Sequence, residues 1–161
     1  MDGIYLAAYK AEHKDYNIVY QDINGLRDIG GDMLEIDLEK YDFIIATPPC
    51  NYWSRANYRR ETSDYSQKTK HLLPTILKKL CNQDKPFIVE NVRSEKMFQK
   101  NGLLDLPCFI YYVGRHTYWT NVMINPSVIK QQNDNINNIA SKDRQGGKNV
   151  HEVIDLFLKT L

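Results

Sequence analysis

Residues 41–50 read YDFIIATPPC, and this stretch indicates the fold class more directly than any other. Its apolar run at 43–46 is continuous rather than alternating, as is typical of a strand covered on both faces of a parallel sheet. The two prolines at 48–49 end the strand, because proline cannot donate a hydrogen bond to a sheet. A second run, PFIVENV at 86–92, has the same character. Helical patterns alternate with such strands, so the sequence predicts an α/β fold with a mostly parallel sheet.

The remaining elements follow from the spacing of apolar residues. Helices are predicted at 4–14, 70–81 and 150–161, and strands at 17–23, 108–113 and 117–123. The last two strands lie on either side of a turn at Gly114-Arg115. Residues 124–148 are rich in Asn, Gln, Lys and Gly, and this composition predicts a flexible polar loop.

Composition excludes several classes of protein. The chain has 161 residues, of which 42% are hydrophobic and 25% charged, so a disordered or collagen-like protein is excluded. The 21 Lys and Arg residues balance 20 Asp and Glu residues, and the net charge of +1 gives no general attraction to nucleic acid. No apolar run approaches the ~20 residues that span a bilayer, and the N-terminus does not resemble a signal peptide. With three cysteines and four scattered histidines, we expect reduced thiols in the cytoplasm and no metal site.

Two segments at predicted strand ends carry residues suited to chemistry. Cys50 follows two prolines, which place a thiol on a rigid backbone at the edge where α/β proteins bind ligands. Glu90 follows the apolar run 87–89 and is flanked by Asn91, so it is placed to donate a proton. Together they suggest covalent catalysis on a polarised ring or carbonyl. The simpler interpretation is a buried thiol and an ion-paired glutamate.

The same segments resemble motifs of the DNA cytosine-5 methyltransferase family. Pro48-Pro49-Cys50 followed by Ser54 resembles the nucleophile motif, and Glu90-Asn91-Val92 resembles the ENV motif, in the same order. Residues 114–121 are similar to the arginine-bearing segment that follows in the family. Residues 147–150, GKNV, resemble the motif that closes the cofactor site.

The resemblance implies a fold, a reaction and a set of site residues. The fold would be a Rossmann-like class I methyltransferase sheet with flanking helices, in a single domain of residues 1–161. Cys50 would attack C6 of a flipped-out cytosine, Glu90 would hold N3 and the exocyclic amine, and Arg115 would stabilise the base oxygen. S-adenosyl-L-methionine would deliver a methyl group to C5. The cofactor-binding residues implied are Gly3, Asp22, Asp32, Pro48 and Asn149.

Contacts to DNA are expected from a local cluster after the nucleophile. Its members are Ser54, Arg55, Arg59 and Arg60, with Tyr58 among them. Such a basic and aromatic cluster can follow a phosphate backbone, although a solvated loop accounts for it about as well.

The chain also departs from the family pattern. Only Asp2-Gly3 remains of the initial FxGxG motif, so we expect the first strand and the Gly-rich loop to be missing and cofactor affinity to be weak. Residues 17–23 and 41–47 should then pair directly, or a second copy or partner chain should fill the gap. Asn51 stands where glutamine is usual, and Arg115 stands alone where two arginines are typical. The polar loop at 124–148 takes the place of a target-recognition domain.

The sequence therefore supports two alternative functions. The first is a minimal or N-terminally truncated DNA cytosine-5 methyltransferase, related to restriction-modification enzymes. Its Asn-, Lys- and Ile-rich composition suggests a phage-like source and action in the cytoplasm of a bacterial host. The alternative is a catalytically degenerate methyltransferase fold that binds nucleic acid or a host protein, for example as a phage inhibitor of a host defence system. Retained Cys50 and Glu90 favour the enzyme, and the missing glycine loop favours the alternative. A third possibility, an amino-methyltransferase, is disfavoured. Its motif needs an aromatic residue after Pro-Pro, where this chain has Cys50.

Overall fold

The computed structural model describes residues 16–17, 19, 21–22, 29–125, 127 and 143–161, with the backbone alone for 21–22, 29 and 143–149. The chain divides into two compact units, residues 1–37 and residues 38–161. The helix expected at 4–14 lies outside the described residues, as does Gly3.

The first unit contains a short two-stranded sheet. Strand β1 (Gln21–Asp22) pairs in parallel with β2 (Ile29–Gly30), with Asp22 opposite Gly30. Within the strand expected at 17–23, the structure therefore shows residues 21–22 as a strand. Its partner there is β2. Of the two arrangements expected, direct pairing with the 41–47 segment is not seen among the described residues, where that segment pairs with a later strand; the other, a second chain in the gap, stays a prediction. Gly31 follows β2 with a φ of 102°, a conformation that favours glycine.

The second unit is built on a four-stranded sheet with the order β3-β4-β6-β5. The strands are β3 (Ile44–Ala46), β4 (Phe87–Val92), β5 (Phe109–Val113) and β6 (His116–Thr120). Strands β3 and β4 are parallel, whereas β6 is antiparallel to both of its neighbours. The expected α/β class, with flanking helices as in a Rossmann-like methyltransferase, is confirmed. The expectation of a mostly parallel sheet is wrong for this unit.

The hairpin of β5 and β6 explains the antiparallel pairs. Val113 lies opposite His116, so the connection is the two-residue turn Gly114-Arg115 that the sequence predicts. Gly114 has a φ of 57°, which such tight hairpin turns require and which glycine adopts without strain. A connection this short can join only antiparallel strands. Because β6 then pairs with β4, both of its ladders are antiparallel.

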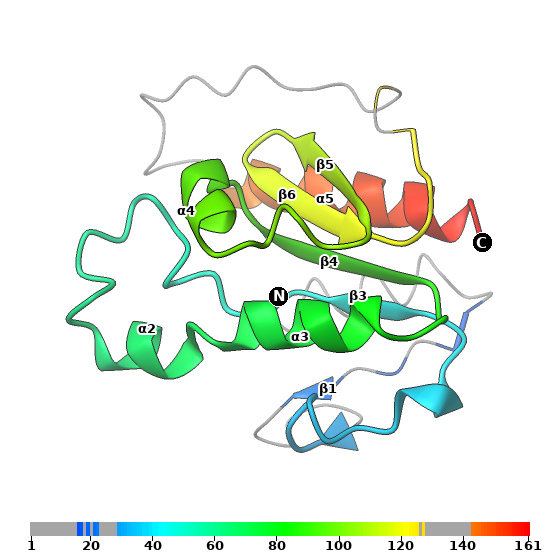
Figure 1. Cartoon of the computed structure of the whole chain (residues 1–161). Helices are drawn as coiled ribbons and strands as arrows, with labels where there is room; N and C mark the ends of the chain where they lie inside the picture. The colour runs from blue at the N-terminus through cyan, green and yellow to red at the C-terminus, as the bar shows by residue number, and fades with distance from the viewer. Residues whose placement is uncertain (1–15, 18, 20, 23–28, 126, 128–142) are drawn as a thin grey trace. The chain divides into compact units, whose positions relative to one another are not determined.

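Four helices and one 3-10 turn complete the described part of this unit. They are η1 (Leu38–Lys40), α2 (Asp64–Thr69), α3 (Leu72–Cys81), α4 (Glu95–Lys100) and α5 (Asp143–Leu158). In Figure 1, α3 lies in front of β3, and α5 passes behind β5 and β6. Helix α3 starts where expected, with Pro74 in its first turn, where proline costs least. No described helix is long and apolar enough to cross a membrane.

Helix α5 begins earlier than the sequence predicts. Residues 143–148, expected within the polar loop, are helical, so the GKNV segment lies inside α5 rather than before it. Two consecutive glycines at 146–147 each lower helix propensity by about 1 kcal/mol, which argues for a loop from local sequence alone. The buried face of Val153, Ile154 and Phe157 stabilises the helix by tertiary packing instead. In the rest of the expected loop, residues 126 and 128–142 lie outside the described residues.

The core places aromatic rings directly beneath the segment that follows β3. The ring of Phe98 from α4 lies 5.0 Å from that of Trp119 on β6 and 5.6 Å from that of Trp53, between ring centroids. All three side chains are buried, and the indole N–H of Trp119 donates to the carbonyl of Leu103 at 2.8 Å. Trp53 stands only three residues after Cys50, so this cluster anchors the chain just beyond the thiol.

Candidate active site

The two predicted motif segments meet at one edge of the sheet. Ala46, the last residue of β3, pairs in parallel with Val89 of β4. The chain therefore leaves β3 towards Cys50 at the level where β4 presents Glu90. Carboxyl ends of adjacent parallel strands are where α/β folds place ligands.

Asn91 links the two segments through its side chain. Its Nδ2 donates to the carbonyl oxygen of Pro48 at 2.9 Å, and its Oδ1 accepts from the N–H of Val92 at 3.0 Å. Asn91 is 1% exposed, and its bond to Pro48 is buried, so water is not an alternative partner for that carbonyl; the bond to Val92 is partly buried. The ENV segment thus fixes the backbone two residues before Cys50.

Cys50 opens a compact turn and keeps its side chain at the surface. Its carbonyl accepts from the N–H groups of Trp53 at 3.0 Å and Ser54 at 2.8 Å. The Trp53 ring is buried, while Cys50 itself is exposed. A buried anchor three residues along the chain therefore holds an accessible thiol on ordered backbone.

The surroundings of this thiol disfavour its charged form. Partial desolvation raises the pKa of the Cys50 thiol above its ordinary value, and the negative charge of Glu90 raises it further. The thiol is therefore protonated at neutral pH in the absence of substrate. This effect of Glu90 on the pKa places its negative charge in the neighbourhood of the thiol.

Glu90 has a partner that the motifs did not reveal. Its Oε1 accepts from Nδ1 of His116 on β6 at 2.6 Å. The imidazole also stacks on the ring of Tyr118, with centroids 6.4 Å apart and an interplanar angle of 23°. Burial raises the pKa of the Tyr118 hydroxyl, with Glu90 adding to the shift, and this hydroxyl has no hydrogen-bond partner among the described residues. Nothing in the sequence marks His116, because its contact with Glu90 depends on strand register.

Arg115 lies beside these groups in the β5–β6 turn. Its carbonyl accepts from the N–H of Arg93 at 2.7 Å, which ties the turn to the end of β4. Its side chain is exposed. The side-chain contact of Glu90 on β6 is with His116.

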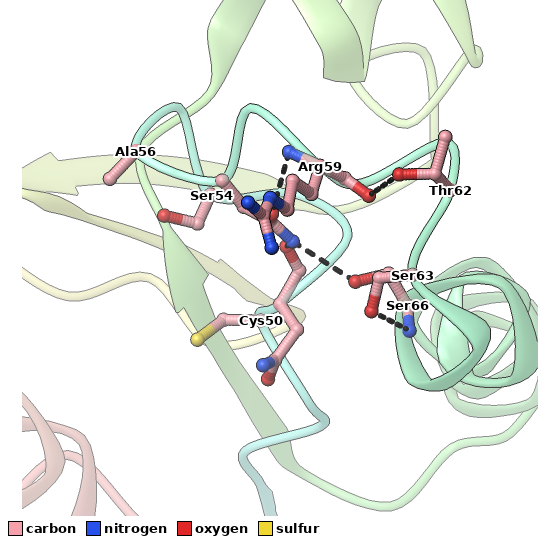
Figure 2. A pocket seen from close by; sticks show the side chains of 9 residues that line it. Cys50, Ser54, Ala56, Arg59, Thr62, Ser63 and Ser66 are labelled. Carbon is pink, nitrogen blue, oxygen red and sulfur yellow. Dashed lines mark hydrogen bonds between the residues drawn. The ribbon is translucent and has the colours of Figure 1, made fainter.

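An open polar cavity of about 840 Å³ lies next to the thiol. It is lined by Cys50, Asn51, Ser54, Ala56, Asn57, Arg59, Thr62, Ser63 and Ser66. Figure 2 shows Cys50 across from Ser63 and Ser66, at the start of α2. Ser63 caps that helix by accepting from the N–H of Ser66 at 3.4 Å, and Asn57 Nδ2 donates to Ser66 Oγ at 3.0 Å. The volume is in the range of small-molecule sites, and the lining offers many hydrogen-bonding groups.

The arginines after Cys50 divide into two kinds. Arg55 and Arg59 are exposed, and the guanidinium of Arg59 lies 5.3 Å from the ring centroid of Tyr58, which is 84% exposed. The guanidinium of Arg60 instead donates to the carbonyls of Asn57 at 3.0 Å and Ser54 at 2.9 Å, and it contacts the sulfur of Met97. Arg60 therefore holds the loop in place, whereas Arg55 and Arg59 are available to a ligand.

Comparison with known proteins agrees with this arrangement. The model for C-5 cytosine-specific DNA methylases matches residues 3–105, which is more than half of the chain. The chain belongs to the C-5 cytosine-specific DNA methylase family. The match includes Cys50 and Glu90 and ends before Arg115, His116 and Asn149. No curated protein and no solved structure gives a significant match.

Members of the C-5 cytosine-specific DNA methylase family generally use S-adenosylmethionine. Of the expected cofactor residues, Asp32 is half-buried, and its Oδ1 accepts from the N–H of Leu34 at 2.9 Å. Its second oxygen is an acceptor suited to the hydroxyl and amine donors of a nucleoside. Pro48 is buried, with its carbonyl bound to Asn91. Asp22 lies on β1 and Asn149 in α5, in segments described by backbone alone.

The described residues contain no group of three or more His, Cys, Asp or Glu that could hold a metal ion.

Proposed function

We propose that this protein is a DNA cytosine-5 methyltransferase that acts through a covalent adduct between Cys50 and C6 of cytosine. One observation carries the proposal. Cys50 and Glu90 come from separate motifs, and their segments meet at the ends of adjacent parallel strands, where the side chain of Asn91 binds the carbonyl of Pro48. A nucleophile with a proton donor nearby is what addition to a pyrimidine ring requires.

The roles follow from the chemistry of the ring. When the Cys50 sulfur forms a bond to C6, its S–H bond breaks and the thiol proton passes to solvent. Electron density moves towards N3, and a proton that Glu90 has taken from solvent neutralises it there. Arg115 stabilises the base oxygen. When bound, S-adenosyl-L-methionine supplies an electrophilic methyl group for C5. Water then takes the C5 proton, N3 returns its proton to Glu90, and the C6–S bond breaks, which restores the aromatic ring and frees Cys50.

Substrate and cofactor contacts are assigned on the same basis. The target carbon is inaccessible inside a duplex, so the cytosine must leave the stack. We assign contacts to the surrounding DNA to Ser54, Arg55 and Arg59, while Arg60 acts indirectly by holding their loop. For the cofactor, we assign Asp22 and Asp32 to hydroxyl and amine donors; the family resemblance implies contacts from Gly3, Pro48 and Asn149 as well.

Mechanism-based trapping tests the proposal. A random-sequence pool of duplexes carrying 5-fluorocytosine, incubated with S-adenosylmethionine and the protein, should yield a covalent adduct, because fluorine prevents elimination from C5. Cys50→Ser should abolish the adduct. The matched controls Cys81→Ser and Cys108→Ser should retain it, because those half-buried thiols lie elsewhere in the fold. An adduct formed equally by Cys50→Ser would refute the assignment.

The raised pKa of Cys50 favours the second candidate function, a degenerate fold that binds without catalysing, because a protonated thiol is a poor nucleophile. That candidate requires DNA or protein binding with no adduct from any form of the chain.

A further inference from the structure

We propose that His116 is a positioning residue that holds Oε1 of Glu90, so that Oε2 is the oxygen that meets the substrate base. The inference rests on the proposed function, because it deepens the role of Glu90 in that reaction. The contact that supports it is the 2.6 Å approach of His116 Nδ1 to Glu90 Oε1. The two side chains are only 20% and 15% exposed, so water competes weakly for either group.

The sheet register creates this contact. Glu90 lies directly opposite Tyr118 in the antiparallel ladder of β4 and β6, and His116 precedes Tyr118 by two residues. His116 is therefore the diagonal neighbour of Glu90 on the same face of the sheet. Diagonal neighbours are separated by roughly 7–8 Å at the backbone, a span that a glutamate and a histidine bridge together.

Two further contacts restrict the imidazole. Its ring stacks on Tyr118, which is fully buried. Its backbone follows the β5–β6 turn, where Gly114 adopts a φ of 57° and the Arg115 carbonyl accepts from Arg93. Ring orientation and backbone position are thus fixed before any substrate arrives, as a positioning residue requires.

The hydrogen bond assigns separate tasks to the two carboxyl oxygens. A neutral imidazole that donates through Nδ1–H makes Oε1 an acceptor, so the transferable proton of a protonated Glu90 resides on Oε2. During addition, the Oε2–H bond breaks, an N3–H bond forms on cytosine, and Glu90 becomes a carboxylate. His116 keeps its own proton throughout. Its hydrogen bond becomes charge-assisted and stronger as Glu90 loses the proton, and it therefore stabilises the transition state more than the ground state.

A merely structural ion pair would have different consequences. It would contribute to the free energy of unfolding, but its loss would leave the rate of adduct formation unchanged once the protein is folded. The positioning role requires a lower rate constant at saturating DNA with the half-saturating DNA concentration unaltered, because His116 contacts Glu90 and not the DNA backbone.

The experiment measures single-turnover adduct formation with the 5-fluorocytosine pool and S-adenosylmethionine. His116→Ala should lower the rate constant about ten- to hundredfold, the equivalent of one hydrogen bond to a charged group. His116→Asn should recover much of the rate, because its amide Nδ2 occupies nearly the position of the imidazole Nδ1. The control His71→Ala removes an exposed imidazole at the start of α3 and should react at the wild-type rate.

A second measurement tests the contact without substrate. The His116 signal in the ¹⁵N-histidine spectrum is identified by its loss in His116→Asn. In the wild-type protein, this signal should show a protonated Nδ1 at neutral pH. An unprotonated Nδ1 would overturn the inference, and so would a wild-type rate for folded His116→Ala. Failure of His116→Asn to recover any rate would also contradict it. If the wild-type chain forms no adduct at all, the proposed function fails first and the catalytic role of His116 fails with it.

Discussion

Replacing Asn91 with alanine should destabilise the protein by more than a typical substitution in a strand. The side chain is 1% exposed and makes two hydrogen bonds to backbone groups, one to the Pro48 carbonyl and one from the Val92 N–H. Alanine leaves both groups without these partners. A buried polar group that loses its partner costs about 1–3 kcal/mol. The Pro48 carbonyl is such a group and the partly buried Val92 N–H adds a smaller cost, so we expect roughly 2–4 kcal/mol in total. For a chain of this size, the expected fall in Tm is about 5–15 °C.

Urea unfolding followed by tryptophan fluorescence measures this effect, because Trp53 and Trp119 are both buried. The matched control is Asn101→Ala. It also removes a side-chain bond to a backbone carbonyl, that of Met97 at 2.7 Å, but at an exposed position, so its cost should stay below about 0.5 kcal/mol. An Asn91→Ala protein within about 0.5 kcal/mol of wild type would refute the idea that this amide fixes the Cys50 segment.

Two further predictions follow from the same region. Arg59→Ala should weaken binding to duplex DNA and flatten its salt dependence with little change in Tm, whereas Arg60→Ala should lower Tm, because Arg60 bonds the loop carbonyls. Equal effects of the two substitutions on both measurements would contradict this division. Alkylation of Cys50 by iodoacetamide should be slow at neutral pH and rise above pH 9, because desolvation and Glu90 both raise its pKa from 9.0. Glu90→Gln should move that rise to lower pH by removing the negative charge, while Cys108, with a pKa raised to about 12, should react last. An unshifted profile in Glu90→Gln would show that the carboxylate does not face the thiol.

Helices and strands that are marked by local sequence patterns could be predicted without the structure. The strand predicted at 86–92 is β4 at Phe87–Val92, and the helix predicted within 70–81 is α3 at Leu72–Cys81. Backbone preferences of proline and the periodicity of apolar side chains act within a few residues, so they can be recognised without a structure. Cys50 and Glu90 could be singled out for the same reason, since each lies in a short continuous motif at a strand end.

Contacts between side chains far apart in the sequence could be identified from the tertiary structure alone. His116 contacts Glu90 because β6 lies between β4 and β5 in one particular register, and a shift of one residue would turn its side chain to the other face. Arg55, Arg59 and Arg60 look alike in sequence, yet Arg60 alone is bound to the loop carbonyls. The early start of α5 likewise depends on packing that overrides two glycines. These features rest on contacts between residues far apart in the chain, whose pairing no local pattern specifies.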